Sequence, residues 1–391
     1  MRTRALSDAS EETVVPMGRR IDLRRVWVQV HLWLGLTLGV VGALVGVTGS
    51  VLVYDRAIDG ALNPQRYATS GNEIALTLAD YAKRAASAAG EGARTVNLRL
   101  PATAGTPVVA FVRARGDTAP PSRVYLDPPT GRVLDAPVGR GLIGWAHDLH
   151  ESLSLREYNG REIVGVVGIA MLVSSLSGIY LWWPRRRLAR RDFRFRRAFT
   201  LSRNLHYTFG FYGSLVLAML AFTGIVLAFP EAGRVGVGLF ASVSPSARGV
   251  QAAESAGGLI EPDDAAAIAL AQFGKASVAS VGFPAGPRGV YRIALREPGD
   301  DSERGTAVVF VDPRSGKVLR QVDRATQTSG DAVLAFQRPL HEGDALGLAG
   351  RIVICGVGLL PALFVVTGTM MWLRSRRKRS LPRAEAAALG G

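Results

Sequence analysis

Four apolar runs constrain this chain more than any other feature. They cover residues 26–53, 163–183, 209–229 and 351–373, and they contain no Asp, Glu, Lys or Arg apart from Arg351 at the edge of the last run. A helix needs about 20 apolar residues to cross about 30 Å of hydrocarbon, and each run reaches or approaches that length. The sequence therefore predicts an integral membrane protein, a four-span α-helical bundle in contact with lipid.

The net charge of +15 is concentrated beside these runs. Nine arginines and a single acid lie between Pro184 and Leu205, and the stretch after the last run begins RSRRKRSLPR. Basic residues flank the cytoplasmic ends of membrane spans, so we expect both termini and the loop 184–208 on that side, and the long loops 54–162 and 230–350 outside. The position of the charge beside spans argues against a nucleic-acid partner.

A short sequence phrase occurs four times in step with the apolar runs. Each copy has Leu or Val before a histidine, then an apolar run, then a small hydroxylated residue followed by glycine. The copies run from His31 to Thr48, from His150 to Ser177, from His206 to Thr223 and from His341 to Thr367. The separation is 17 residues in the first and third copies but 27 and 26 in the second and fourth. The repeating unit is therefore a pair of spans.

The two long loops carry a second internal repeat. In the first, a helical pattern in NEIALTLADYAKRAASA precedes the strand-like stretches RTVNLRL and TPVVAFVRA and the hairpin VYLDPPTGRVL. The second has the same order, with EPDDAAAIALAQFG, SVASVGFP, VYRIALRE and VVFVDPRSGKVL. The sequence predicts a duplicated unit of span, small α+β outer domain and span, whose copies are related by an axis along the membrane normal.

The predicted organisation follows from these two repeats. Its segments are 1–25, a cytoplasmic segment; 26–53, the first span; 54–162, an outer domain; 163–183, the second span; 184–208, a basic loop; 209–229, the third span; 230–350, a second outer domain; 351–373, the fourth span; and 374–391, a basic tail.

The recurring histidines are the candidate site. Alternating topology places His31 with His206 at the cytoplasmic face and His150 with His341 at the outer face. Two imidazoles fill both axial positions of a haem iron and leave none for substrate, which favours electron transfer. The one cysteine, Cys355, and the absence of a C-x-x-C-H motif mean that such a haem would be haem b, held without a covalent bond. We expect two haems, each with two histidine ligands.

Other interpretations of these residues stay open. A single histidine near a helix end can sit among lipid headgroups without any cofactor. His147, the fifth histidine, could replace His150 as a ligand, form a hydrogen bond with it, or contact something outside the protein, and a role in supporting the ligand is favoured. Gly35 and Gly210 follow His31 and His206 by four residues, and the missing side chains could clear room for a porphyrin face. The acidic residues beside His150 and His341 could orient imidazoles or simply be solvated; they are Asp148, Glu151, Glu342 and Asp344.

Several motifs give the chain a resemblance to the PepSY-associated transmembrane family over nearly its whole length. They are DLHESL with GIYLWWP, RNLHYTFG with AFTGIVLAF, PLHEG with TGTMMWLRSRR, and the hairpins containing VYLDPPTG and VFVDPRSG. The resemblance implies a multi-pass haem protein of the bacterial inner membrane, linked to iron uptake through reduction of ferric siderophores at the periplasmic face. It also implies PepSY-like outer domains, and it carries the haem-ligand role onto His31, His206, His150 and His341.

The leading hypothesis is thus an oxidoreductase that passes electrons to a ferric siderophore or other ferric chelate. No nucleotide-binding G-x-G-x-x-G opens a helix after a strand, so an external donor such as a quinol or a reductase is expected. The alternative is a non-catalytic envelope scaffold or sensor, whose PepSY-like domains bind or inhibit a periplasmic peptidase or another partner. A metal transporter is a weaker third hypothesis, because the spans lack acidic residues.

Overall fold

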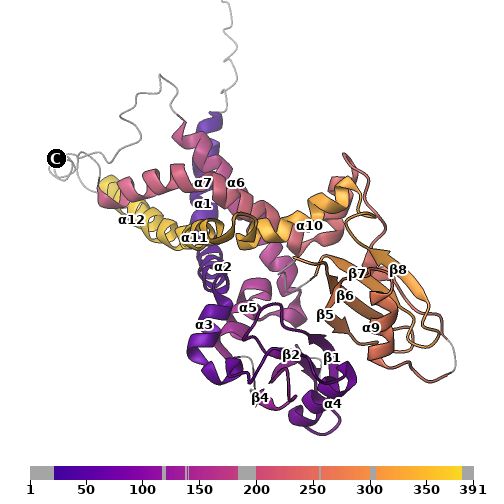
Figure 1. The fold of residues 1–391 in the computed structure, drawn as a ribbon. Helices are drawn as coiled ribbons and strands as arrows, with labels where there is room; N and C mark the ends of the chain where they lie inside the picture. Colours follow the sequence, from indigo (N-terminus) through magenta and orange to yellow (C-terminus); the bar gives the residue numbers. More distant parts are fainter. Residues whose placement is uncertain are drawn as a thin grey trace, which may run out of the picture.

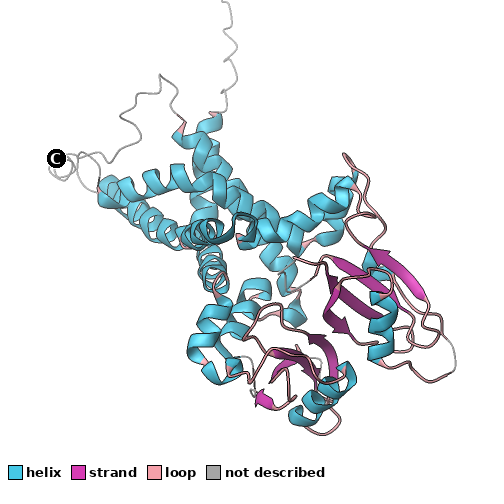
Figure 2. Ribbon diagram, in the orientation of Figure 1, coloured by secondary structure: helices cyan, strands magenta, loops and turns pink. Residues whose placement is uncertain are grey.

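A helical bundle and an antiparallel sheet make up the protein, with the sheet at one end of the bundle (Figures 1 and 2). The computed structural model describes residues 22–116, 120–136, 139, 141–183, 200–254, 257–299 and 305–380. The cytoplasmic segments predicted from the charge pattern lie largely outside these residues. The main bundle helices are α1 (Leu23–Thr37), α2 (Gly39–Leu52), α6 (Gly160–Trp182), α7 (Leu201–Ala228), α11 (Gly347–Gly358) and α12 (Leu360–Ser380).

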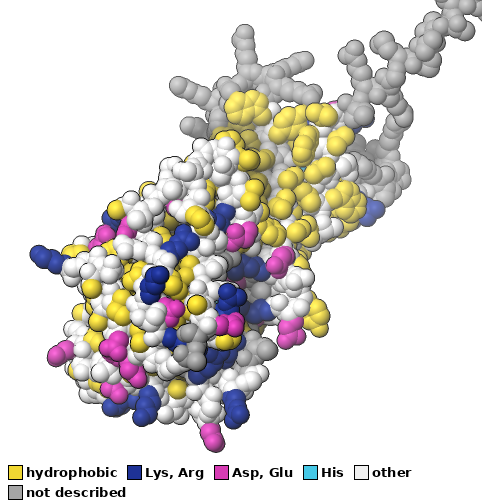
Figure 3. Space-filling model, turned by 90° about the vertical axis from the view of Figure 1, so that its right-hand side faces the viewer, with side chains coloured by type: hydrophobic (Ala, Val, Ile, Leu, Met, Phe, Trp, Pro, Cys, Tyr) yellow, Lys and Arg dark blue, Asp and Glu magenta, His cyan; other side chains and the backbone are white. Residues whose placement is uncertain are grey.

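The bundle has the length and surface of a membrane domain. Two single helices, α6 and α7, and the helical stretch Asp344–Arg377 are long and apolar enough to cross a membrane, and α1 with α2 would make a fourth span. Hydrophobic side chains gather on the bundle surface, whereas charged side chains gather on the sheet end (Figure 3). Leu215 on α7 is 73% exposed and Val366 on α12 is 58% exposed. Such apolar exposure fits a lipid environment.

The first predicted span is not one straight helix. The run 26–53 is divided at Leu38, where α1 and α2 meet at 60°. Glycine begins α2, and glycine weakens a helix by about 1 kcal/mol relative to alanine, so the chain can bend here at low cost. A Cβ at Gly39 would lie only 3.1 Å from Val365 Cγ2. The bend therefore depends on a small residue at the start of α2.

Close backbone contact joins α2 to α11. A Cβ at Gly46 would collide with the carbonyl oxygen of Gly358, and the Ser50 hydroxyl donates to the Cys355 carbonyl at 2.8 Å. Small residues and interhelical hydrogen bonds of this kind hold helices together where lipid removes the hydrophobic driving force.

The strands form one eight-stranded antiparallel sheet in the order β4-β3-β2-β1-β5-β6-β7-β8. The strands predicted from the repeats are all present. Their bounds are β1 (Arg94–Arg99), β2 (Val108–Arg113), β3 (Ser122–Leu126), β4 (Val133–Asp135), β5 (Ser277–Gly282), β6 (Tyr291–Arg296), β7 (Ala307–Val311) and β8 (Val318–Val322). The helices α4 (Leu78–Ala89) and α9 (Pro262–Leu270) also match predicted helices, and both contribute to the core under the sheet.

The two outer repeats are joined into one body, which the prediction of two small α+β domains did not include. Strand β1 of the first repeat pairs with β5 of the second, with Leu98 opposite Val281. Both side chains are fully buried in one hydrophobic core that draws residues from both repeats. The reason is that β1 and β5 would each be an edge strand of a separate half-sheet, and pairing them removes these two edges and leaves only β4 and β8 at the edges of the sheet.

Short helices connect the sheet to the bundle. They are α3 (Asp55–Leu62), η1 (Pro64–Tyr67), α5 (Gly141–Ser152), η2 (Arg156–Tyr158), α8 (Pro230–Gly238), η4 (Ala247–Gly249), α10 (Ser329–Glu342) and η5 (Asp344–Leu346). Helix α10 begins at a capping box between Thr328 and Asp331 and ends at Gly343, whose φ of 86° favours glycine. The chain thereby sets α5 and α10 between the sheet and the spans (Figure 1).

We expect Leu98→Ala to lower the free energy of unfolding of the sheet by about 2–5 kcal/mol, because it leaves a cavity where β1 meets β5. Hydrogen exchange of the full-length protein should then accelerate in β7 as well as in β2. Val133→Ala, at a position that is 36% exposed, is the control. Faster exchange confined to β1–β4 would contradict a shared core.

Candidate functional site

The structure brings the four recurring histidines together in two pairs. His31 on α1 faces His206 on α7, with ring centroids 6.3 Å apart and ring planes at 86°. His150 on α5 faces His341 on α10, with centroids 6.1 Å apart and planes at 53°. We call His31/His206 the distal pair and His150/His341, on the helices next to the sheet, the proximal pair. These are the pairs expected from alternating topology, and their role as ligands remains a prediction.

The distal pair is held by residues that close two of the repeated phrases. His31 Nδ1 lies 3.0 Å from the Ser177 hydroxyl and 3.1 Å from the Ser174 carbonyl on α6. His206 Nδ1 lies 2.9 Å from the Thr367 hydroxyl on α12. Each imidazole is therefore fixed by a helix other than its own.

The proximal pair is held in the same way. His341 Nδ1 lies 2.8 Å from the Thr223 hydroxyl on α7. His150 Nδ1 lies 2.9 Å from the Val45 carbonyl on α2, and the Thr48 hydroxyl donates to that same carbonyl at 3.0 Å. The histidine of the first phrase thus lies at the end of the second, and the histidine of the second lies near the end of the first. The third and fourth phrases are related in the same way.

These contacts favour a proton on Nδ1. The three hydroxyls that meet an imidazole each donate their own hydrogen to a carbonyl one turn earlier; the bonds are Ser177 to Ser174, Thr223 to Met219 and Thr367 to Leu363, at 2.9, 2.9 and 2.7 Å. A carbonyl can only accept, so Nδ1 is the donor and Nε2 has the lone pair in His31 and His150. In His206 and His341 the bond from the hydroxyl to its own helix favours the same tautomer. Among the described residues, no protein group forms a hydrogen bond with these Nε2 atoms.

The glycine that ends each phrase makes room for the incoming ring. A Cβ would lie within 3.6 Å of an imidazole Cε1 at all four positions; the glycines are Gly49 beside His150, Gly178 beside His31, Gly224 beside His341 and Gly368 beside His206. At Gly49 the distance would be 2.7 Å, too short for any side chain. The hydroxylated residue and the glycine that end a phrase therefore form a contact site for the histidine of another phrase, and we call this site a seat. Sequence analysis found the repeated ending but missed this role.

Open space lies next to the distal pair. A Cβ built at Gly35 or at Gly210 would meet no atom within 4 Å. Each glycine is about one helical turn from a histidine of the pair, so these backbones leave a gap beside the imidazoles. That these glycines give clearance to a flat group remains a prediction.

The spacing of the two rings within each pair suits a metal bound between them. Two imidazoles that bind one metal through Nε2 hold their ring centres roughly 6 Å apart, given metal–nitrogen bonds of about 2.0–2.1 Å. The observed 6.3 and 6.1 Å agree with that spacing. Within the described ranges no group of three or more His, Cys, Asp or Glu side chains could hold a metal ion. A metal at either pair would need its remaining ligands from a cofactor, and the residues present fit a haem with two histidine ligands.

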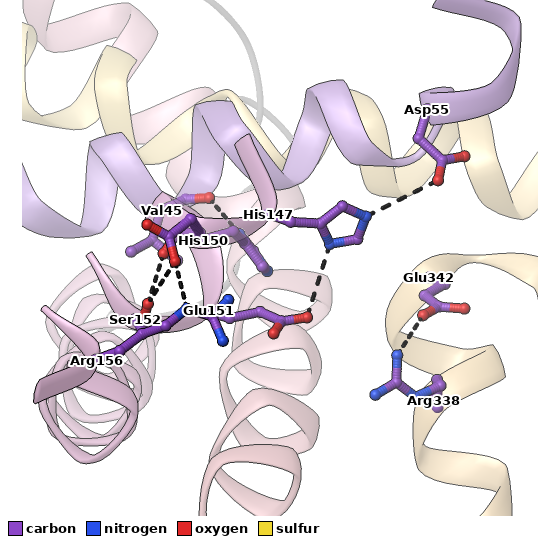
Figure 4. A network of polar contacts seen from close by, with 10 residues as sticks. Val45, Asp55, His147, His150, Glu151, Ser152, Arg156, Arg338 and Glu342 are labelled. Carbon is purple, nitrogen blue, oxygen red and sulfur yellow. Dashed lines mark hydrogen bonds and ion pairs between the residues drawn. The ribbon is translucent and has the colours of Figure 1, made fainter. Parts of the chain in front are cut away.

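His147 lies apart from this arrangement. Its Nε2 is 4.0 Å from Asp55 and its Nδ1 is 3.7 Å from Glu151, so both ring nitrogens face carboxylates (Figure 4). Since its neighbour His150 faces His341, the geometry favours His150 as the candidate ligand. The Asp55 and Glu151 carboxylates raise the pKa of His147 above its usual value, and His147 in turn lowers the pKa of Glu151.

The other acidic residues near the histidines pair with arginines. Asp148 is buried, with 2% of its side chain exposed, and accepts from Arg156 Nε at 2.5 Å. Glu342 accepts from Arg338 at 2.9 Å (Figure 4), and Asp344 accepts from Arg351 at 2.7 Å. The ion pair between the buried Asp148 and the exposed Arg156 ties η2 to the end of α5, and sequence spacing alone did not reveal it.

Together, the fold and the site define a multi-pass membrane protein in which interlocked helix repeats fix two facing pairs of histidines beneath an antiparallel sheet. A family model described as the PepSY-associated TM region matches residues 28–375, and the chain belongs to that family. Comparison with curated proteins gave no significant match.

The raised pKa of His147 predicts a pH-dependent contribution to stability. A histidine whose pKa is raised on folding stabilises the folded state, and the full stabilisation is present at pH values below its unfolded pKa of about 6.5. This stabilisation is lost as the pH rises through the pKa of the folded state. Asp55→Asn should lower the pKa of His147 and reduce the fall in melting temperature between about pH 6 and pH 8, measured by differential scanning fluorimetry. Glu91→Gln, an exposed carboxylate beyond α4, is the control. An Asp55→Asn profile identical to the wild type would show that this pair does not control the titration.

Proposed function

We propose that the chain is a haem-b electron-transfer protein of a bacterial inner membrane that passes electrons to a ferric siderophore or other ferric chelate at the periplasmic face, for iron uptake. The observation that carries this proposal is the arrangement of four histidines in two facing pairs. In each ring Nδ1 forms a hydrogen bond, and no described residue forms a hydrogen bond with Nε2. Haem iron held by two histidines exchanges single electrons and keeps no position for substrate.

The protein's own residues supply the orientation. Nδ1 bonds to Ser177, Thr367 and Thr223 prevent the rings from turning, as supporting hydrogen bonds do for metal-binding histidines in general. Glycines beside the rings let the helices close around them without pushing the imidazoles apart. Such fixed donors suit a centre that must change charge with little rearrangement.

One helix connects the two pairs. Helix α7 carries His206 of the distal pair and, 17 residues later, Thr223, which holds His341 of the proximal pair. At about 1.5 Å per residue, these positions are about 26 Å apart along the axis. Two centres at these levels would divide the crossing into shorter steps.

The direction of transfer follows from the charge pattern. The arginine-rich stretch 184–199 precedes α7, so the positive-inside rule puts the distal pair towards the cytoplasm and the proximal pair and the sheet towards the periplasm. Both termini would then be cytoplasmic. The electron donor would be a quinol or a separate reductase, and the acceptor would approach from the sheet side.

The alternative, a scaffold whose PepSY-like sheet binds a peptidase or another partner, needs only anchoring helices. It gives no reason for four imidazoles with the same hydrogen-bonding state, or for four glycine seats. A metal transporter would need clustered ligands along a path, and the described residues hold no group of three or more His, Cys, Asp or Glu side chains that could bind a metal ion.

We expect purified protein to show a reducible low-spin haem absorption spectrum with two haems per chain. His31→Ala and His341→Ala should each lose one haem and keep most of the other, because the pairs use different histidines. His147→Ala should keep both. Haem content is measured by pyridine haemochrome assay. A colourless wild-type protein would end this proposal and favour the scaffold.

Thr223→Val removes the acceptor of His341 Nδ1 while keeping the side-chain shape. Loss of such a supporting bond costs about 10–100-fold in metal affinity, so we expect haem to leave the proximal centre at correspondingly lower competitor concentrations in an apo-myoglobin transfer assay. Thr37→Val, whose hydroxyl bonds only to its own helix at Trp33, is the matched control. Equal haem retention in both variants would show that the hydroxyl does not support the histidine.

A further inference from the structure

A pocket lined by three arginines lies beside the proximal pair. It has a volume of about 310 Å³, is open to the surface, and is lined by the start of α6, the end of α7, α8, η4 and α10. Its charged and polar lining residues are Arg161, Glu231, Arg234, Ser246 and Arg338. Three arginines and one carboxylate, Glu231, line it, and Arg338 also pairs with Glu342, so these groups carry one net positive charge, which favours an anion. We call it the arginine pocket.

Each arginine uses one part of its guanidinium group in a contact with the protein and has further N–H donors. Arg161 Nη2 donates to the Leu227 carbonyl at 2.5 Å, and Arg338 Nη1 donates to Glu342 at 2.9 Å. Arg234 donates to the Ser244 carbonyl and lies 3.9 Å from Glu231. A guanidinium has five N–H groups, so each of the three can offer further hydrogen bonds in a fixed direction. Side chains ordered in this way lose little freedom when they bind a carboxylate.

The pocket adjoins the proximal pair on two separate helices. On α10, Arg338 lies three residues before His341. On α7, Val226 of the pocket lies three residues after Thr223, which holds the His341 ring. Three residues are slightly less than one helical turn, or about 4.5 Å along the axis. A ligand in the pocket would therefore be a close neighbour of the proximal imidazoles.

We infer that the arginine pocket binds a carboxylate-bearing ferric chelate, the electron acceptor of the proposed function, and seats its iron beside the proximal pair. This inference rests on the proposed function for the identity of the acceptor, but the anion site itself is defined by the pocket alone. Its volume is at the lower end of those of small-molecule sites, so it takes one compact chelate or the acidic arm of a larger one.

The test measures binding of radiolabelled ferric citrate to full-length protein in nanodiscs of zwitterionic lipid, by equilibrium filtration. Arg161→Gln with Arg234→Gln should weaken ferric citrate binding by about 10–100-fold, because two charge-assisted contacts are lost. Binding of ferrioxamine B, a cationic chelate, should not weaken. Glu231→Gln should strengthen ferric citrate binding several-fold, which keeps the test decisive if the double variant folds poorly. Arg288→Gln, an exposed arginine of the sheet end, is the control.

Unchanged ferric citrate binding in the double variant, together with no gain in Glu231→Gln, would overturn the inference. The same experiment in nanodiscs with phosphatidylglycerol tests a lipid headgroup as the source of the anion. Arginine-dependent retention of that lipid without arginine-dependent binding of ferric citrate would also overturn it. Filtration needs no haem, so it separates the two proposals. Arginine-dependent binding by a colourless protein would support the pocket and contradict the redox function. A coloured protein whose binding is unaffected by the arginine substitutions would support the redox function and contradict the pocket.

Discussion

The hydrogen bond from each histidine Nδ1 to a neighbouring helix is the interaction on which the rest of the site depends. It engages Nδ1, satisfies a polar atom of a largely buried ring, and leaves Nε2 available to a ligand. Inside a bundle with little water, an unpaired Nδ1 would be costly, so the acceptor and the ring belong together. The phrase of histidine, apolar run, hydroxyl and glycine is therefore one structural device used four times.

Duplication makes this device reciprocal. The first two phrases exchange histidines, as do the last two, and the facing pairs then join one histidine from each half of the chain. Each half consequently holds its own two histidines and presents them to the two of the other half. The sheet repeats the same logic outside the bundle, because β1 and β5 close each other's open edge and bury Leu98 against Val281. With both halves tied at the sheet and in the bundle, helices α5 and α10 present His150 and His341 at a fixed separation.

Much of this arrangement could be predicted from the sequence, and the remainder has identifiable reasons. Alternating topology was sufficient to pair His31 with His206 and His150 with His341, and the helix and strand patterns of the outer repeats were predicted correctly. The seats at Thr223 and Gly224 could not be assigned, because the repeat does not state which helices become neighbours. The bend at Leu38 and the joining of the two half-sheets also escaped prediction. Both depend on contacts between distant segments, such as Gly39 with Val365. The arginine pocket likewise brings Arg161, Arg234 and Arg338 together only through the fold.

Electron paramagnetic resonance of the oxidised full-length protein tests the central claim most directly, because it reports the axial ligands of ferric iron at each centre. The imidazole planes lie at 86° in one pair and 53° in the other, so we expect two low-spin ferric signals of different shape. The signal of the distal pair should disappear in His206→Ala and that of the proximal pair in His150→Ala. A high-spin spectrum, a single signal unaffected by either substitution, or no iron signal would contradict the claim that these facing histidines each hold one iron.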